Sequence, residues 1–137
     1  MGRYPERDRG VMLKVLDLSE VEAEATEMYR KEKGDPDGRI EAGWTPWGVA
    51  EKDGKLYVVC NEGVGYEVTD EEPLVVDLYR RAEGSMTIFP TMQANLAPDD
   101  VRRFTTDEEI DLADLVRTFG QRLEDNFGLW YSVLGGA

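Results

Sequence analysis

Histidine is absent from this sequence of 137 residues, and cysteine occurs once, at Cys60. Without histidine there is no imidazole to act as a general base, to ligate a metal or to activate a serine or cysteine nucleophile. A single cysteine forms no intrachain disulfide and no cluster for zinc or iron–sulfur. Cys60 ends an apolar run with no basic residue close by, which predicts a packed and unreactive thiol. We therefore expect no catalytic residues, no cofactor, no metal and no enzymatic activity.

Basic residues are scarce, because 16 Lys and Arg stand against 29 Asp and Glu and leave a formal net charge of −13. Binding of duplex nucleic acid depends on clustered cations that release counterions, so this balance argues against it. An excess of carboxylates with only 5 lysines is typical of a solvated surface in a salty cytoplasm, which suggests a halophile. The alternative is an acidic surface that imitates nucleic acid or docks on a basic partner.

Long apolar runs are missing as well. No segment is long enough to form a transmembrane helix, and no apolar stretch follows the charged first ten residues as a secretory signal requires. We expect a protein of the cytoplasm, or of a virion if it is virus-encoded, without membrane contact. The 41% hydrophobic content is enough for one core. The predicted organisation is a polar arm at 1–10, a single α+β domain at 11–128 and an apolar tail at 129–137.

The first predicted helix covers about residues 20–33, behind a strand or lead-in at 11–18. Ser19 and Glu22 have the spacing of a capping box, in which each side chain bonds the backbone amide of the other residue. Gly34 is suited to the position just after the helix. An apolar stripe supports this helix and consists of Val21, Ala25, Met28 and Tyr29.

Between residues 43 and 90 the apolar period is two, and turn signals recur, which predicts an antiparallel meander. Asp53-Gly54 predicts a two-residue hairpin turn, because a type I′ turn needs positive φ at both positions. Pro90 is expected to end the last strand, since proline has no amide for the ladder. Four to six such strands form one curved sheet in this prediction.

A second helix, the longest element, is predicted from about 107 to 127, after a short helical turn at 97–104. Thr106 and Glu109 have the spacing of another capping box. The predicted fold is therefore α+β, with both helices packed on one face of the meander sheet.

The acidic motifs of the sequence are explained by turns and helix starts without a metal or a catalytic pair. The segment Asp35-Pro36-Asp37-Gly38 has part of a calcium-loop spacing but lacks the third oxygen ligand and the closing glutamate, so a Pro-Asp-Gly turn accounts for it. Paired carboxylates such as Asp99-Asp100 lie at turns or helix starts, where exposed acids are favoured.

Three segments are candidates for interactions. Trp44 and Trp47, in the run GWTPWG, either form a stacking platform for a sugar, a peptide or a single-stranded base, or cover one end of the sheet. The apolar tail either returns as a final strand or inserts into another subunit. The basic arm either frays or lies on a neighbouring subunit. The candidate residues are Arg3, Arg7, Arg9, Trp44, Trp47, Leu129, Trp130, Tyr131, Val133 and Leu134.

The leading hypothesis is a non-enzymatic interaction or assembly subunit, forming a homo-oligomer or part of a larger complex, such as a virus-encoded structural or accessory component. The alternative is a small acidic inhibitor or immunity-type protein that occupies a basic, nucleic-acid-binding partner. Its contact residues would be Asp107, Glu108, Asp111 and Asp114 on the second helix. A third class, a small enzyme, would have to use carboxylates, Tyr, Lys and Arg alone.

Overall fold

A computed structural model describes most of the predicted domain. The described residues are 12–43, 47–59, 65–82, 84–112 and 114–115. The predicted arm and tail, Trp44, Cys60 and most of the predicted second helix lie outside them. The described residues form eight strands and two helices, which is the predicted α+β class.

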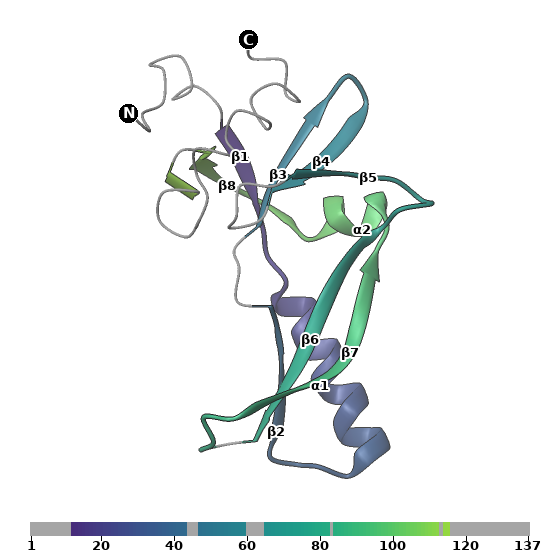
Figure 1. The fold of residues 1–137 in the computed structure, drawn as a ribbon, viewed down its shortest axis with the longest axis vertical. Helices are drawn as coiled ribbons and strands as arrows, with labels where there is room; N and C mark the ends of the chain where they lie inside the picture. The colour runs from purple at the N-terminus through teal and green to yellow at the C-terminus, as the bar shows by residue number, and fades with distance from the viewer. Residues whose placement is uncertain (1–11, 44–46, 60–64, 83, 113, 116–137) are drawn as a thin grey trace.

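Five strands form a sheet at the top of Figure 1, in the order β5-β4-β3-β1-β8, with each neighbouring pair antiparallel. Their bounds are β1 Met12–Leu16, β3 Trp47–Lys52, β4 Lys55–Val59, β5 Gly65–Val68 and β8 Thr105–Asp111. The predicted hairpin between β3 and β4 is confirmed, because Asp53 and Gly54 both have positive φ, at 53° and 78°.

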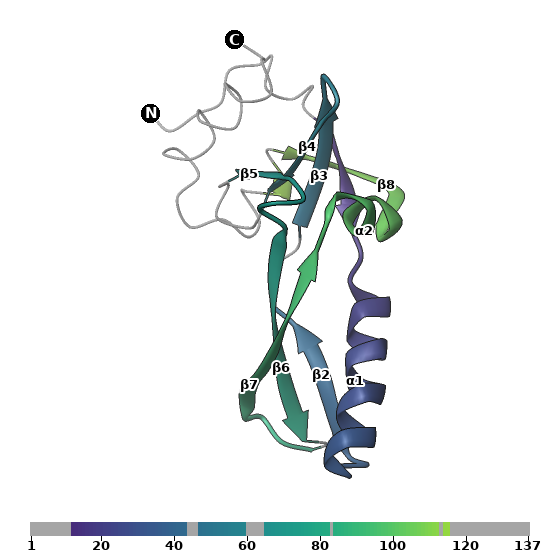
Figure 2. The same ribbon diagram turned by 90° about the vertical axis from the view of Figure 1, so that its right-hand side faces the viewer.

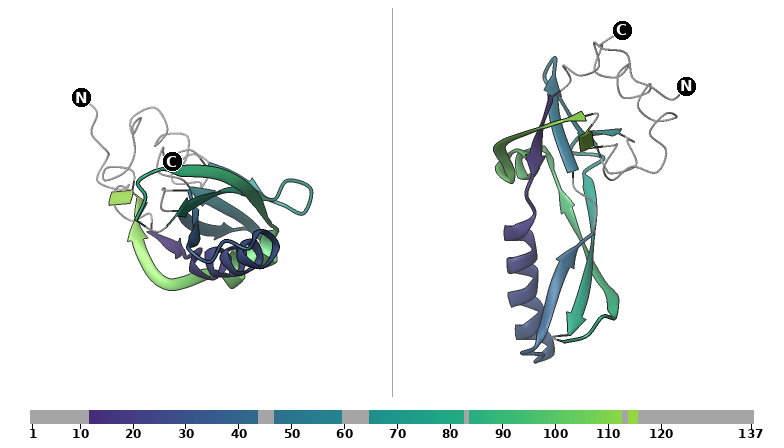
Figure 3. Two further views of the ribbon diagram at one scale, coloured as in Figure 1. Left: turned by 90° about the horizontal axis from the view of Figure 1, so that it is seen from below. Right: turned by 90° about the vertical axis from the view of Figure 1, so that its left-hand side faces the viewer.

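Three further strands form a second sheet in the order β2-β6-β7, again antiparallel. They are β2 Gly38–Ala42, β6 Leu74–Ala82 and β7 Ile88–Leu96. Helix α1, Ser19–Lys33, runs alongside this sheet in Figures 2 and 3. The prediction of one curved sheet is therefore wrong. Strand β6 leaves the meander because pairing with β2 lets its buried residues Leu74, Val76 and Leu78 share one core with α1.

Pro90 does not end a strand, contrary to the prediction, because β7 runs on to Leu96. Strand β7 is the outer strand of its sheet, and the register shifts where Tyr79 faces Pro90 and Leu78 faces Met92. Thr91 is the extra residue of this bulge, and its hydroxyl donates to the Leu78 carbonyl at 3.0 Å. A proline is tolerated at such a position since no ladder bond needs its missing amide.

Helix α1 begins without the predicted capping box. The Ser19 amide donates to Asp17 Oδ1 at 2.9 Å, and the Ser19 hydroxyl donates to the same oxygen. Glu22 instead accepts a hydrogen bond from the Ala42 amide, at 2.7 Å. The predicted bond between Glu22 and the Ser19 amide is thus wrong, and Glu22 binds an amide of strand β2 instead. The helix ends as predicted at Gly34, whose amide donates to the Arg30 carbonyl at 2.8 Å.

Side chains of α1 cover the outer edge of β2. Glu22 Oε1 accepts from the Ala42 amide, Thr26 Oγ1 accepts from the Ile40 amide at 3.0 Å, and Arg30 Nε donates to the Gly38 carbonyl at 3.0 Å. The spacing of these three helix residues fits the spacing of the backbone groups on β2, because four helical residues rise about 6 Å and two strand residues about 6.6 Å. An edge strand that would otherwise expose unpaired backbone groups is therefore closed by one stripe of the helix.

The predicted short helical turn is confirmed as helix α2, Pro98–Arg103, but the long helix predicted from 107 is wrong over its first five residues. Residues 105–111 form β8, which pairs with β1. Thr106 is not a helix cap, since its hydroxyl donates to the Val15 carbonyl at 3.3 Å. Glu109 forms an ion pair with Lys14 at 3.3 Å. The open edge of β1 outweighs the local helix signals, and helical backbone is present at Leu112, Asp114 and Leu115.

One cluster of buried side chains joins the two sheets. It includes Leu16 and Val58 from the five-stranded sheet, Ile40 and Leu78 from the three-stranded sheet, and Val101 from α2. The sequence prediction that α1 buries Val21 and Ala25 is confirmed, whereas Met28 is 52% exposed.

Candidate functional site

Trp47 lies where the two sheets meet. It begins β3 and faces Leu16 of β1 across the strand pair. Its ring is partly buried against the common core, and its Nε1 is buried without a hydrogen-bond partner in the described part of the chain. Packing at the end of the sheet was one of the two readings of this tryptophan, and the structure shows that contact.

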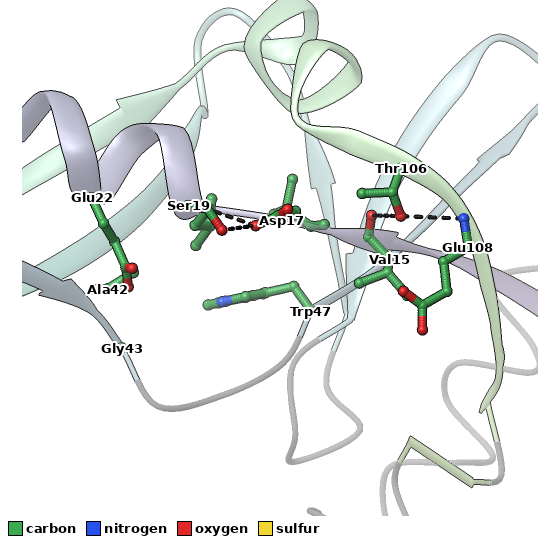
Figure 4. A pocket seen from close by; sticks show the side chains of 11 residues that line it. Val15, Asp17, Ser19, Glu22, Ala42, Gly43, Trp47, Thr106 and Glu108 are labelled. Atoms are coloured by element: carbon green, nitrogen blue, oxygen red, sulfur yellow. Dashed lines mark hydrogen bonds between the residues drawn. The ribbon is translucent and has the colours of Figure 1, made fainter.

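A depression of about 270 Å³ opens on one side of Trp47 (Figure 4). We call it the carboxylate depression. Figure 4 shows Glu22 and Ala42 at one end, Thr106 and Glu108 at the other, and the indole between them. Its lining comes from the end of β1, the start of α1, the end of β2, and strands β3 and β8: Val15, Leu16, Asp17, Leu18, Ser19, Glu22, Ala42, Gly43, Trp47, Thr106 and Glu108.

The three carboxylates of this depression differ in what they already bind. Asp17 accepts hydrogen bonds from the hydroxyl and the amide of Ser19, and these two bonds, the hydroxyl first, lower the pKa of Asp17 below its ordinary value. Glu22 is occupied by the Ala42 amide. The exposed Glu108 carboxylate accepts no hydrogen bond from any described residue, although the Glu108 amide donates to Thr106 Oγ1 at 3.3 Å. The depression therefore presents carboxylate oxygens beside an aromatic ring, a combination suited to a cationic group.

A second depression, of about 300 Å³, also borders Trp47. Tyr66 of β5 and Val75 of β6 line it and are 51% and 46% exposed. Glu67 and Glu72 add carboxylates to its lining. Trp47 thus lines both depressions, one mainly polar and one mainly apolar.

The predicted turn at Asp35 is stabilised by an ion pair. The Asp35 carboxylate binds the guanidinium of Arg80 on β6 and accepts from the Asp37 amide at 3.3 Å. The hydrogen bond from Arg80 is the main reason why the pKa of Asp35 is lowered. Among the described residues no group of three or more Cys, Asp or Glu side chains is arranged to hold a metal ion.

Of the ten candidates from the sequence, Trp47 falls within the described residues, and the other nine lie outside them. Asp17, Glu22 and Glu108 were not singled out together, because they come from three elements that are far apart in sequence. The Ser19-to-Glu22 spacing did mark one of them, but as a helix cap. Asp107, Glu108 and Asp111, which were assigned to a helix face, lie on the outer strand β8 instead.

Neither helix in the described part of the chain has the length and apolar character that a membrane-spanning helix needs. The sequence matches no protein-family model, and comparison with curated proteins and with solved structures finds no match.

Proposed function

We propose that this chain is a non-enzymatic protein-interaction or assembly subunit, which forms a homo-oligomer or part of a larger complex. The observation that carries the proposal is the surface around Trp47, where one aromatic ring borders two depressions. Protein interfaces typically combine an aromatic or apolar centre with a polar rim. Tyr66 and Val75 supply partly exposed apolar groups here, and Glu108 supplies a rim carboxylate.

Both depressions have Trp47 in their lining, so they belong to one continuous surface. A standard protein interface covers about 800 Å² on each partner. Aromatic side chains in such settings often carry a large part of the binding energy.

Native mass spectrometry and light scattering across a wide concentration range test the proposal. We expect the intact chain to self-associate, and we expect Val75→Glu to weaken the association about tenfold, because it places a charge in the apolar depression. Ala23→Glu is the matched control, since it adds the same charge at an exposed position of α1 outside both depressions. A chain that stays monomeric at every concentration would contradict the assembly function.

The predicted tail is tested in the same measurement. A chain that ends at Gly128 should have a lower average mass than the intact chain if residues 129–137 insert into a neighbouring subunit. Equal masses would favour a tail that returns onto its own subunit.

The second candidate is an inhibitor or immunity-type protein that binds a basic partner. It is favoured by the carboxylates around Trp47 and by the acidic run on β8. Binding to a cationic peptide would fall steeply with salt, and Glu108→Lys would weaken it. Self-association without affinity for cationic peptides favours the first candidate.

A further inference from the structure

Charge is distributed unevenly along the long axis of the molecule. We define the distal end as the end farther from the five-stranded sheet, at the bottom of Figures 1 and 2, made of residues 27–41, 79–82 and 84–89. It carries six basic and five acidic side chains, a net charge of +1. The other described residues carry five basic and eighteen acidic side chains, a net charge of −13. One end is therefore nearly neutral and the other strongly acidic.

The distal end contains a depression lined by arginines. Its volume is about 580 Å³, and we call it the arginine depression. Arg30 of α1, Arg39 of β2 and Arg81 of β6 line it together with one acid, Asp37. The remaining lining residues are Ala82, Gly84, Ser85 and Met86.

Two of these arginines face each other across neighbouring strands. Arg39 and Arg81 are direct partners in the β2–β6 register, a placement that is unfavourable for like charges. A single carboxylate, Glu41, binds both, at 2.6 Å from Arg39 and 3.4 Å from Arg81. The side chain of Arg39 nevertheless remains 69% exposed. The guanidinium of Arg39 therefore stays accessible to a partner although it is paired with Glu41.

Exposed apolar side chains accompany the arginines. Met86, which lines the depression, is 89% exposed, and Phe89 at the start of β7 is 51% exposed. Arginine, methionine and aromatic residues are enriched in protein interfaces, whereas lysine and acids are depleted. The lining of the arginine depression, with three arginines and Met86 against one acid, therefore has the composition of a docking surface for an acidic protein partner.

The opposite end of the same molecule offers such a partner. Asp107, Glu108 and Glu109 are consecutive exposed acids on β8, the outer strand of the five-stranded sheet. Glu108 borders the carboxylate depression beside Trp47 and accepts no hydrogen bond within the described residues. The charge of the acidic end is opposite to that of the arginine depression. The ring of Trp47 also offers a surface onto which a guanidinium can stack.

We propose that the arginine depression of one copy binds the carboxylate depression of a second copy, so that the chains assemble head to tail. The inference rests on the proposed assembly function and names its partner and orientation. Because the two surfaces differ, the interface is heterologous, and each copy keeps one free surface after binding. Addition of copies then continues until a ring closes or a filament forms.

Two charge reversals test this arrangement by native mass spectrometry and light scattering. Arg39→Glu removes the basic surface and Glu108→Lys removes the acidic one. Each variant alone is expected to associate at least about tenfold more weakly than the natural chain. An equimolar mixture is expected to form heterodimers, because the intact basic surface of the Glu108→Lys variant binds the intact acidic surface of the Arg39→Glu variant.

Controls separate docking from general charge repulsion. Lys55→Glu, in the β3–β4 hairpin, changes the net charge as much as Arg39→Glu and should leave association within about twofold. Glu108→Lys changes the net charge from −13 to −11. Repulsion alone then predicts stronger association, whereas docking predicts weaker association. Met86→Glu, at an 89% exposed position, gives a second variant of the arginine depression. Circular dichroism and urea unfolding of each variant confirm that it folds.

The outcomes distinguish the two proposals. If the natural chain associates but Arg39→Glu, Met86→Glu and Glu108→Lys associate equally well, the head-to-tail inference is wrong and the assembly function stands. If both charge-reversal variants are monomeric and their mixture gives no heterodimer, the inference is also wrong. A natural chain that is monomeric under all conditions contradicts the assembly function and this inference together.

Discussion

Gly48 of β3 lies against the buried side chain of Leu13 on the neighbouring strand β1. A Cβ atom at position 48 would overlap Leu13 Cδ1 and lie 3.0 Å from Leu13 Cβ. Leu13 is 0% exposed, so it has little room to move away. Glycine at this position is therefore required by packing between strands.

Gly48→Ala is expected to destabilise the protein by about 1–3 kcal/mol, because it overpacks the contact with Leu13. Urea unfolding monitored by circular dichroism measures the change. Gly43→Ala is the matched control, since a Cβ there meets no atom within 4 Å. Its effect should stay within about 0.5 kcal/mol. Equal stability of the two variants would show that Leu13 does not confine position 48.

Single residues also show why the two predicted capping boxes were wrong. Ser19 and Thr106 both carry the hydroxyl and the following acid of a capping box, yet Ser19 bonds Asp17 and Thr106 bonds Val15 and Glu108. A hydroxyl or a carboxylate in the sequence predicts that the side chain will form a hydrogen bond. The spacing along the chain does not predict its partner, because competing partners come from distant elements.

At the scale of elements, helix α1 and strand β2 depend on each other. The stripe formed by Glu22, Thr26 and Arg30 satisfies backbone groups on the outer edge of β2. The spacing of apolar residues predicted α1, because these residues form its buried side. The polar residues of the stripe have no such spacing pattern, so their contacts with β2 are known only from the folded structure.

Thr26→Val is expected to destabilise the protein by about 1–3 kcal/mol, because it leaves the partly buried Ile40 amide without an acceptor. Hydrogen exchange of the Ile40 amide should become faster in the same variant. Thr26→Ser keeps the hydroxyl and should keep both the amide protection and most of the stability. Unchanged exchange at Ile40 in the valine variant would contradict the closed edge.

Strand β8 illustrates a limit of element prediction. Residues 105–111 carry a capping-box spacing and an acidic start, which favour a helix locally. They form a strand because β1 offers an unpaired edge, with Leu13 facing Ile110 and Lys14 facing Glu109. Such non-local pairing overrides propensity, and it moves the acids from a helix face to a sheet edge.

At the scale of the whole molecule, the negative charge is concentrated rather than spread. The described residues outside the distal end hold eighteen acids against five basic side chains. Repulsion among these acids opposes folding, and salt screens it over about 10 Å at 0.1 M. The excess of carboxylates that suggested a salty environment is thus a property of one end of the fold.

We expect the melting temperature to rise between low and molar KCl, by about 4 °C for each kcal/mol of repulsion that salt screens. Differential scanning calorimetry at neutral pH measures the shift. Glu71→Lys, at an exposed position within the run Asp70–Glu72, should raise the melting temperature at low KCl and reduce its salt dependence. A melting temperature that does not change with KCl would contradict both the repulsion and the halophile hypothesis.

The sequence by itself determined the α+β class, the extent of α1, the hairpin at Asp53-Gly54 and the short helix after Ala97, because these depend on periodicity, positive φ and local capping. It also determined that the chain has no histidine and no intrachain disulfide. The tertiary structure decided the division into two sheets, the fate of Pro90 and β8, and the grouping of Asp17, Glu22 and Glu108 around Trp47. It also decided that Arg30, Arg39 and Arg81 gather at the end opposite the acidic one. These features depend on which edges and faces meet in space, and that information is not contained in any short stretch of sequence.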